Sequence, residues 1–212
     1  VILTILLGLG GWAMFIRTLY VSEPKIEGKI LQVSAGESEL PLETFTGSDV
    51  EPKTKTTGWT AFWVFVYITN VHRNAVHISD YELEIARAEG QEFEKIGKVS
   101  THAKNVNLLL ADYNNQFKFH VPDVQQKLLL HQGKLVEYGR PVYGICLFGA
   151  KKPLSYFAPT FQDITLKLTL VDILGNRHVL KHSRGDGVPV KSLAGLFGGA
   201  LTEVKQEPST QE

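Results

Sequence analysis

Seven histidines are the side chains of this sequence best suited to metal binding or acid–base chemistry, namely His72, His77, His102, His120, His131, His178 and His182. His178 and His182 lie four residues apart in a strand-like stretch, so they share one face but stand about 13 Å apart along it. His72 and His77 flank a polar turn and could approach one another. Neither pair has a cysteine or a third histidine at ligand spacing, so we interpret the histidines as surface residues and predict no metal site.

Three acidic residues form a second arrangement that could bind a metal ion. Asp80, Glu82 and Glu84 alternate along one segment and therefore point to the same side. A loop that supplied carbonyl oxygens would complete a calcium site there. The sequence contains no Asp-rich calcium loop, and the solvated face of an amphipathic strand explains the spacing more simply.

Cys146 is the only cysteine and lies within the apolar residues 145–148. A thiol in such surroundings behaves as a small hydrophobic side chain, whereas a nucleophilic thiol needs an electropositive and partly open site. A single cysteine also excludes an internal disulfide and any multi-cysteine zinc or iron–sulfur centre. We therefore interpret Cys146 as part of the core.

The sequence lacks the motifs of common enzyme classes. It has no Gly-x-Ser-x-Gly turn, dinucleotide fingerprint, zincin helix or kinase signature. Residues 149–153 combine glycine with lysine but lack the spacing of a phosphate-binding loop, so they indicate a basic turn. We predict that the protein is not an enzyme and uses no cofactor. The alternative is an anchored hydrolase or metal-dependent enzyme whose site assembles from residues distant in the sequence.

The composition is that of a folded protein without a strong net charge. Of the 212 residues, 43% are hydrophobic and 21% are charged, which favours a packed core over disorder. Lysine and arginine total 22, and aspartate and glutamate also total 22, so no net field attracts nucleic acid. This length predicts one domain with accessory segments.

Residues 1–16 contain no charged side chain, and Arg17 is the first charge in the chain. As a helix this stretch would span roughly 24 Å, and snorkelling of Arg17 would extend it toward the ~30 Å of a hydrocarbon core. A cleaved signal peptide and a buried helix are the alternatives, but no small-x-small cleavage site follows promptly. We therefore predict a transmembrane helix, retained as a single membrane anchor, at residues 1–21.

The residues after the anchor predict a stalk and then a series of strands. Residues 22–58 contain a first strand near 29–34 and then a flexible loop rich in Ser, Thr, Pro and Glu. Residues 59–69 are apolar on both faces, which is typical of a central strand that is covered on both sides. Residues 81–85 alternate with glutamates, so this next strand is expected to be half-buried.

The same alternation recurs twice in the second half of the chain. Apolar side chains occupy every second position in residues 117–121 and again in residues 164–170. Gly175 and Asn176 tolerate positive φ, so the later strand is expected to turn back into residues 178–180 as a hairpin. About seven short strands separated by turn signals predict an antiparallel sandwich.

Few helices are expected in this β-sandwich core, which we assign to residues 59–184. Residues 124–132 and residues 107–111 could form short helices, and neither is long enough to build a helical layer. Residues 185–212 read as a mobile C-terminal tail, because glycines penalise a helix in its apolar part and its end is polar. The alternative for residues 188–201 is a weakly amphipathic helix that contacts the sheet, the membrane or a partner.

The order of these features resembles that of a group of bacterial proteins. The resemblance rests on Ile-Thr-Asn at residues 68–70, Tyr-Glu-Leu-Glu at 81–84, the segment 137–148 and the hairpin at 171–176, within residues 59–182. It is a resemblance to uncharacterised bacterial membrane-anchored proteins with an extracytoplasmic immunoglobulin-like domain. It implies an immunoglobulin-like β-sandwich outside the cytoplasm of a single-pass protein, and it supplies no catalytic residues. The disulfide of antibody-type domains is excluded.

The anchor, the strand pattern and the lack of catalytic motifs together predict a binding or assembly module at the cell membrane, and the resemblance implies that it lies on the extracytoplasmic side. Its partner would be a protein or an envelope polymer. Exposed aromatic and apolar side chains often mark such contacts. We therefore expect contacts from the loop at residues 36–58 and from two apolar segments, through Tyr156, Phe157, Leu193, Leu196 and Phe197.

Overall fold

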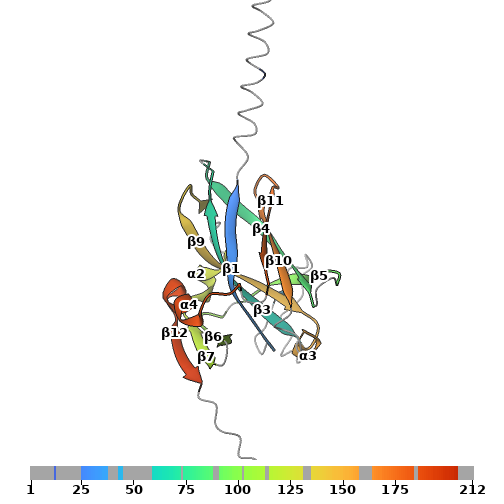
Figure 1. Cartoon of the computed structure of the whole chain (residues 1–212), viewed down its shortest axis with the longest axis vertical. Coiled ribbons are helices and arrows are strands. Elements are labelled where there is room, and N and C mark those ends of the chain that lie inside the picture. Colours follow the sequence, from blue (N-terminus) through green and yellow to red (C-terminus); the bar gives the residue numbers. More distant parts are fainter. Residues whose placement is uncertain are drawn as a thin grey trace, which may run out of the picture.

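The chain folds mainly into antiparallel strands, as seen in a computed structural model (Figure 1). The structure describes residues 12, 25–37, 43–44, 59–72, 74–87, 91–101, 103–112, 115–130, 135–157, 164–183 and 186–204. The helices in these ranges are short, and the hydrophobic cores are built mostly from strand residues. The predicted all-β class is therefore confirmed.

Nine strands form one large curved sheet. Its main path runs through β1 (Ile26–Glu37), β3 (Thr60–Asn70), β9 (Pro141–Ala150), β5 (Glu94–Ser100), β4 (Val76–Ala86), β10 (Thr165–Asp172) and β11 (Arg177–His182). Two short strands extend this path, namely β2 (Glu43–Thr44) on β5 and β8 (Leu135–Val136) on β4. The curvature brings the two outer strands side by side, and the amide of Ile26 in β1 donates a hydrogen bond of 3.4 Å to Nδ1 of His178 in β11.

Two bulges help to bend this sheet. In β1 the pairing with β3 skips Leu31, and in β4 the pairing with β10 skips Ser79. An extra residue on one strand bends that strand and increases its twist. The backbone carbonyl of Leu31 accepts a hydrogen bond of 2.8 Å from the amide of Val188, so the first bulge also attaches the C-terminal segment.

A second sheet of three strands covers part of the outer face of the first. It consists of β12 (Ala200–Val204), β7 (Asn115–Val121) and β6 (Val106–Asp112), in that order. Helix α4 (Val190–Phe197) lies beside it, as Figure 1 shows. Two shorter helices, α2 (Val124–Lys127) and α3 (Leu154–Phe157), follow β7 and β9 in the chain.

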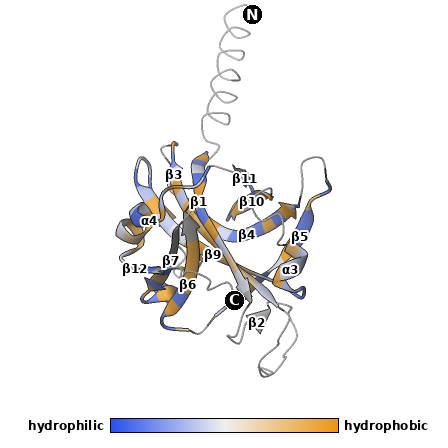
Figure 2. Ribbon diagram, turned by 60° about the horizontal axis from the view of Figure 1, so that its bottom comes forward, coloured by the Kyte–Doolittle hydropathy of each residue, from blue (hydrophilic) through white to orange (hydrophobic). Residues whose placement is uncertain are grey.

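Strand β3 separates two hydrophobic cores. Alternate side chains of β3 and β9 belong to the core inside the curved sheet, namely Phe62, Val64, Val66, Ile68, Cys146 and Phe148. The other side chains belong to the core below the three-stranded sheet and α4, namely Ala61, Trp63, Phe65, Ile145 and Leu147. The prediction of a central strand covered on both faces is confirmed, and Cys146 is buried as expected. Strands with one solvated face, such as β4, alternate in hydropathy instead (Figure 2).

The C-terminal segment differs from the expected mobile tail, because residues 190–197 form α4 and residues 200–204 form β12. Residues 205–212 lie outside the described ranges. Val190, Leu193 and Phe197 follow helical spacing and fill one side of the second core. Of the glycines that argued against a helix, Gly198 ends it in a left-handed conformation with φ 58°, where glycine is favoured. Only Gly195 lies inside the helix.

The sheet topology also differs from the sandwich that was expected. One continuous curved sheet with a small second sheet takes the place of the two opposed sheets of an immunoglobulin sandwich. Residues 106–112 form the strand β6 and not a helix, because Val106, Leu108 and Leu110 alternate toward the second core. The hairpin of β10 and β11 is present as predicted, with Gly175 at φ 85°.

The two ends of β3 lie next to different parts of the fold. Strand β1 begins beside Asn70, where the carbonyl of Lys25 accepts a hydrogen bond of 3.0 Å from the amide of Val71, and we call this the proximal end. Helix α3 lies beyond Thr60, whose hydroxyl donates to the carbonyl of Lys152, and we call this the distal end. The eleven residues of β3 separate the two ends by about 35 Å.

No helix within the described ranges is long and apolar enough to cross a membrane. The anchor predicted at residues 1–21 lies outside those ranges except for Trp12.

Candidate functional site

A buried aspartate–histidine pair lies at the proximal end. Asp172 ends β10, and its carboxylate accepts hydrogen bonds of 2.9 Å from the amides of Leu174 and Asn176 and from the side chain of Asn176. Its Oδ2 also lies 3.2 Å from Nε2 of His178. Burial alone would raise the pKa of Asp172, but these hydrogen bonds hold that pKa below its usual value. The pair ties the β10–β11 hairpin together.

The position of His178 corrects its interpretation as a surface residue. Its side chain is buried, Nε2 faces Asp172, and Nδ1 accepts the amide of Ile26. The sequence could not show this, because the two partners of His178 belong to two other strands, β10 and β1. An imidazole with both nitrogens occupied is a structural connection and has no open nitrogen for a substrate.

The other described histidines lie on or beside different strands. His72, His77 and His182 are partly buried, and His120 pairs with Asn107 at 2.9 Å. Burial lowers the pKa of His182. His102 and His131 lie outside the described ranges. Within these ranges, no three metal-ligating side chains come close enough together to hold an ion.

The acidic residues of β4 are paired with cations on neighbouring strands. Asp80 forms an ion pair with Lys98 of β5, and Glu84 forms one with Lys167 of β10 at 2.6 Å. Glu82 contacts both Lys95 and Arg177, and their hydrogen bonds lower its pKa. This face is the solvated, charged side of the sheet, as the alternation predicted.

The distal end presents an aromatic ring between two cations. The Cζ atom of Arg87 lies 4.3 Å, and Nζ of Lys152 3.9 Å, from the centre of the Tyr156 ring in α3. The Tyr156 hydroxyl donates to Glu94 at 3.2 Å, and Glu94 pairs with Lys152 at 2.5 Å. Hydrogen bonds to Glu94 and Tyr156 raise the pKa of Lys152. We call Arg87, Glu94, Lys152 and Tyr156 the Tyr156 cluster.

The Tyr156 cluster is held in place by the residue that follows it. Phe157 is only 1% exposed, and its ring packs edge to face on Phe62 of β3 with centroids 5.0 Å apart. Tyr156 itself stays partly exposed beside it. Near the same end, Nζ of Lys151 lies 5.3 Å from the centre of the Trp59 ring. Aromatic rings under cations therefore recur around α3.

The five contact residues expected from the sequence fall into two groups. Phe157, Leu193 and Phe197 have buried side chains that form the two cores. Tyr156 and Leu196 are the two with exposed surface, and Leu196 is 41% exposed. A partner contact by side chains stays a prediction for these two residues. The loop at residues 36–58 is described only at residues 36–37 and 43–44.

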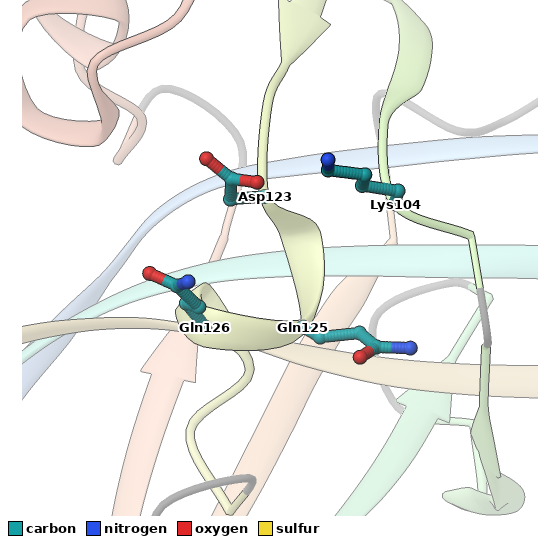
Figure 3. Close-up of a pocket in the computed structure, with 4 residues that line it drawn as sticks. All are labelled: Lys104, Asp123, Gln125 and Gln126. Carbon is teal, nitrogen blue, oxygen red and sulfur yellow. The ribbon is translucent and has the colours of Figure 1, made fainter.

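A shallow pocket of about 310 Å³ lies beside α2, lined by Lys104, Asp123, Gln125 and Gln126 (Figure 3). None of these four side chains is buried. A ligand site normally combines apolar walls with a few converging polar groups. The polar, exposed lining makes this pocket a weaker candidate than the Tyr156 cluster.

Sequence reasoning singled out Tyr156 but missed its neighbours Arg87, Glu94 and Lys152. Arg87 follows β4 and Glu94 begins β5, so only the pairing of these strands brings them to α3. The available signal was local, because Lys151 and Lys152 precede an aromatic pair by a few residues. That signal indicated a basic turn and not a cation–aromatic cluster.

Comparison with known proteins does not place this chain in a family. No family model matches the sequence, and no curated protein matches it. A crystal structure of a protein from Bacillus subtilis described as a "putative lipoprotein" (ycdA) is similar at 14% sequence identity with a TM-score of 0.31. The match covers 80% of this chain and 40% of that chain, so this chain spans less than half the length of its neighbour.

Proposed function

We propose that this protein is a membrane-anchored binding module, with no catalytic role, and that its distal end docks a protein partner or an envelope polymer. The Tyr156 cluster carries this proposal. Tyrosine and arginine are enriched among the residues that dominate binding energy at interfaces. Phe157 fixes the ring of its neighbour, so little side-chain freedom is lost when a partner binds.

The charge of this end favours an acidic partner. Among the described residues around α3, Arg87 and Lys151 lie over the rings of Tyr156 and Trp59, and Lys152 pairs with Glu94. The excess of cations would attract carboxylate or phosphate groups at a distance, and the aromatic rings would then supply contact area. An anionic envelope polymer and an acidic protein surface share this chemistry.

The proposed arrangement places the docking end away from the membrane. The apolar residues 1–16 support a single N-terminal anchor, and β1 begins at the proximal end. The Tyr156 cluster lies at the other end of β3, about 35 Å away. We place the domain on the extracytoplasmic side, as in the proteins with an immunoglobulin-like domain that the sequence resembles. That side and that relationship stay predictions.

Recovery of a partner from solubilised membranes tests the proposal. The full chain serves as bait beside the double variant Arg87→Ala/Tyr156→Ala. Leu109→Ala is the control, because Leu109 is 58% exposed on β6 and lies outside the cluster. We expect the unaltered chain and the control to recover the same partner and the double variant to recover it about tenfold less. Equal recovery by all three chains, or no recovery by any, would overturn the proposal.

The alternative of an anchored hydrolase or metal-dependent enzyme has no specific observation in its favour among the described residues. His178 lies beside a carboxylate, as a catalytic histidine does, but both of its nitrogens are engaged. A hydrolase substrate panel and metal analysis of the purified chain would revive this alternative if either gave a signal.

A further inference from the structure

Five large apolar side chains are exposed at the proximal end. They are Val71 (40% exposed), Leu135 (52%), Tyr138 (60%), Ile173 (70%) and Leu174 (74%). We call them the apolar rim. Single exposed apolar residues are common on protein surfaces, but a group of them at one site marks an interaction surface.

Backbone contacts show that the apolar rim is continuous. The carbonyl of His77 accepts the amide of Ile173 at 3.0 Å, and His77 pairs with Leu135. Asn70 pairs with Tyr138, and the next residue after Asn70 is Val71. The side chain of Asn70 joins these two parts, because it donates to the carbonyl of Val136 at 3.1 Å. The rim is therefore built from three neighbouring segments, namely the turn after β3, residues 135–138 and the tip of the β10–β11 hairpin.

The tip of the β10–β11 hairpin is the most unusual part of this face. Polar residues and glycine normally occupy such turns, whereas Ile173 and Leu174 stand here with most of their surface exposed. The buried carboxylate of Asp172 holds the turn by accepting the amides of Leu174 and Asn176. The two apolar side chains are thus fixed in an outward position by buried hydrogen bonds.

We propose that the apolar rim rests in the interface of the lipid bilayer to which the chain is anchored. This inference depends on the N-terminal anchor of the proposed function. Only residues 17–24 lie between the uncharged residues 1–16 and Lys25, which enters the sheet at this end. Fully extended, those residues reach at most about 29 Å, so the rim is the face that an anchored domain holds nearest to the bilayer.

The chemistry of the rim fits an uncharged lipid surface. Tyr138 combines an apolar ring with a hydroxyl, the type of side chain that is enriched at membrane interfaces. Among the described residues at this end, the cations Lys25 and Arg140 each pair with a glutamate, Glu27 and Glu137. The attraction therefore comes from insertion of apolar side chains and not from anionic lipid headgroups.

Fluorescence of the full chain in vesicles of zwitterionic phosphatidylcholine tests the inference. An environment-sensitive dye is attached at Leu174→Cys, and lipids with nitroxides in their acyl chains act as quenchers. Cys146 is buried, so labelling favours the introduced thiol. Phe93→Cys, at a residue that is 43% exposed at the start of β5, is the matched control, and Met14→Cys reports on the anchor.

We expect lipid nitroxides to quench the dyes at Met14→Cys and Leu174→Cys but not at Phe93→Cys. Adding Ile173→Asp should reduce the quenching at Leu174→Cys severalfold, because a charged side chain opposes insertion. Quenching at Met14→Cys alone would support the N-terminal anchor but overturn the inference that the rim contacts the bilayer. A dye at Leu174→Cys that neither lipid nitroxides nor aqueous iodide quench would indicate cover by a second copy, which also overturns it. A lack of quenching at Met14→Cys would overturn the anchor and the inference together.

Discussion

At the proximal end, Asp172 and His178 are buried, while Ile173 and Leu174, which directly follow Asp172, are largely exposed. At the distal end, Phe157 is buried, while Tyr156, which directly precedes it, carries two cations on its ring. At the proximal end a buried polar pair therefore lies beside exposed apolar side chains, and at the distal end a buried ring lies beside a partly exposed polar cluster.

The difference shows two ways to fix an exposed side chain. The Asp172 carboxylate accepts hydrogen bonds from the amides of Leu174 and Asn176, so it determines the backbone on which Leu174 stands. Phe157 has no such directional bonds and holds its short helix by filling space next to Phe62. Removing the buried partner at each end should therefore release the exposed neighbour.

The largest expected effect is at the distal end. Phe157→Ala removes a fully buried ring from the core and should lower the free energy of unfolding by about 3–5 kcal/mol. Tyr156→Ala is the control and should cost about 1 kcal/mol or less, since that ring is partly exposed. Urea unfolding followed by circular dichroism measures both. Similar losses for the two variants would contradict the view that Phe157 is a buried core residue and Tyr156 an exposed contact residue.

A somewhat smaller effect is expected at the proximal end. Asp172→Ala leaves two backbone amides and His178 without their acceptor and should lower the free energy of unfolding by about 2–4 kcal/mol. Asp80→Ala removes an exposed carboxylate that pairs with Lys98 and should cost about 1 kcal/mol or less. If both aspartates proved equally dispensable, the hydrogen bonds of Asp172 would not be what holds the hairpin.

The strands could be predicted from the sequence because their side chains alternate with the period of a pleated sheet. This holds for residues 81–85 and for the hairpin around Gly175. Residues 59–69 do not alternate, and their β-branched and aromatic side chains on both faces indicated a strand instead. The sheet order could not be predicted, since the pairing of β9 with β3 and of β10 with β4 joins residues far apart in the chain. Alternation fixes which side chains share a face but not which strand lies beside them.

The candidate site was predictable only in part, for the same reason. Tyr156 was visible as an aromatic residue in a turn, but Arg87 and Glu94 reach it from other strands. Phe157 has the same local appearance as Tyr156, and only the fold shows that it points into the core. The exposure of Ile173 and Leu174 was equally hidden, because two apolar residues beside a strand read as its continuation.

The smallest expected effect is on stability at acid pH. It distinguishes the two ends of the β10–β11 hairpin, because His182 lies at one end and Asp172 at the other. Burial lowers the pKa of His182 below its ordinary 6.5, and hydrogen bonds lower the pKa of Asp172 below its ordinary 3.8. In both cases the unfolded chain binds the proton more readily than the folded chain. The free energy of unfolding is therefore highest above the ordinary pKa of each group. It falls as the pH drops through the pKa that the group has in the folded chain.

The free energy of unfolding should decrease first as the pH falls below about 6.5, through His182, and again below about 3.8, through Asp172. Glu82 also has a lowered pKa and contributes to the loss at acid pH, so each step is assigned by comparing a variant with the unaltered chain. His182→Gln should remove only the first decrease, and Asp172→Asn only its share of the second. Urea unfolding at intervals from pH 3 to pH 8 measures both. If His182→Gln kept the decrease near pH 6.5, the burial of His182 would not be its source, and the two ends of the hairpin would not respond independently to acid.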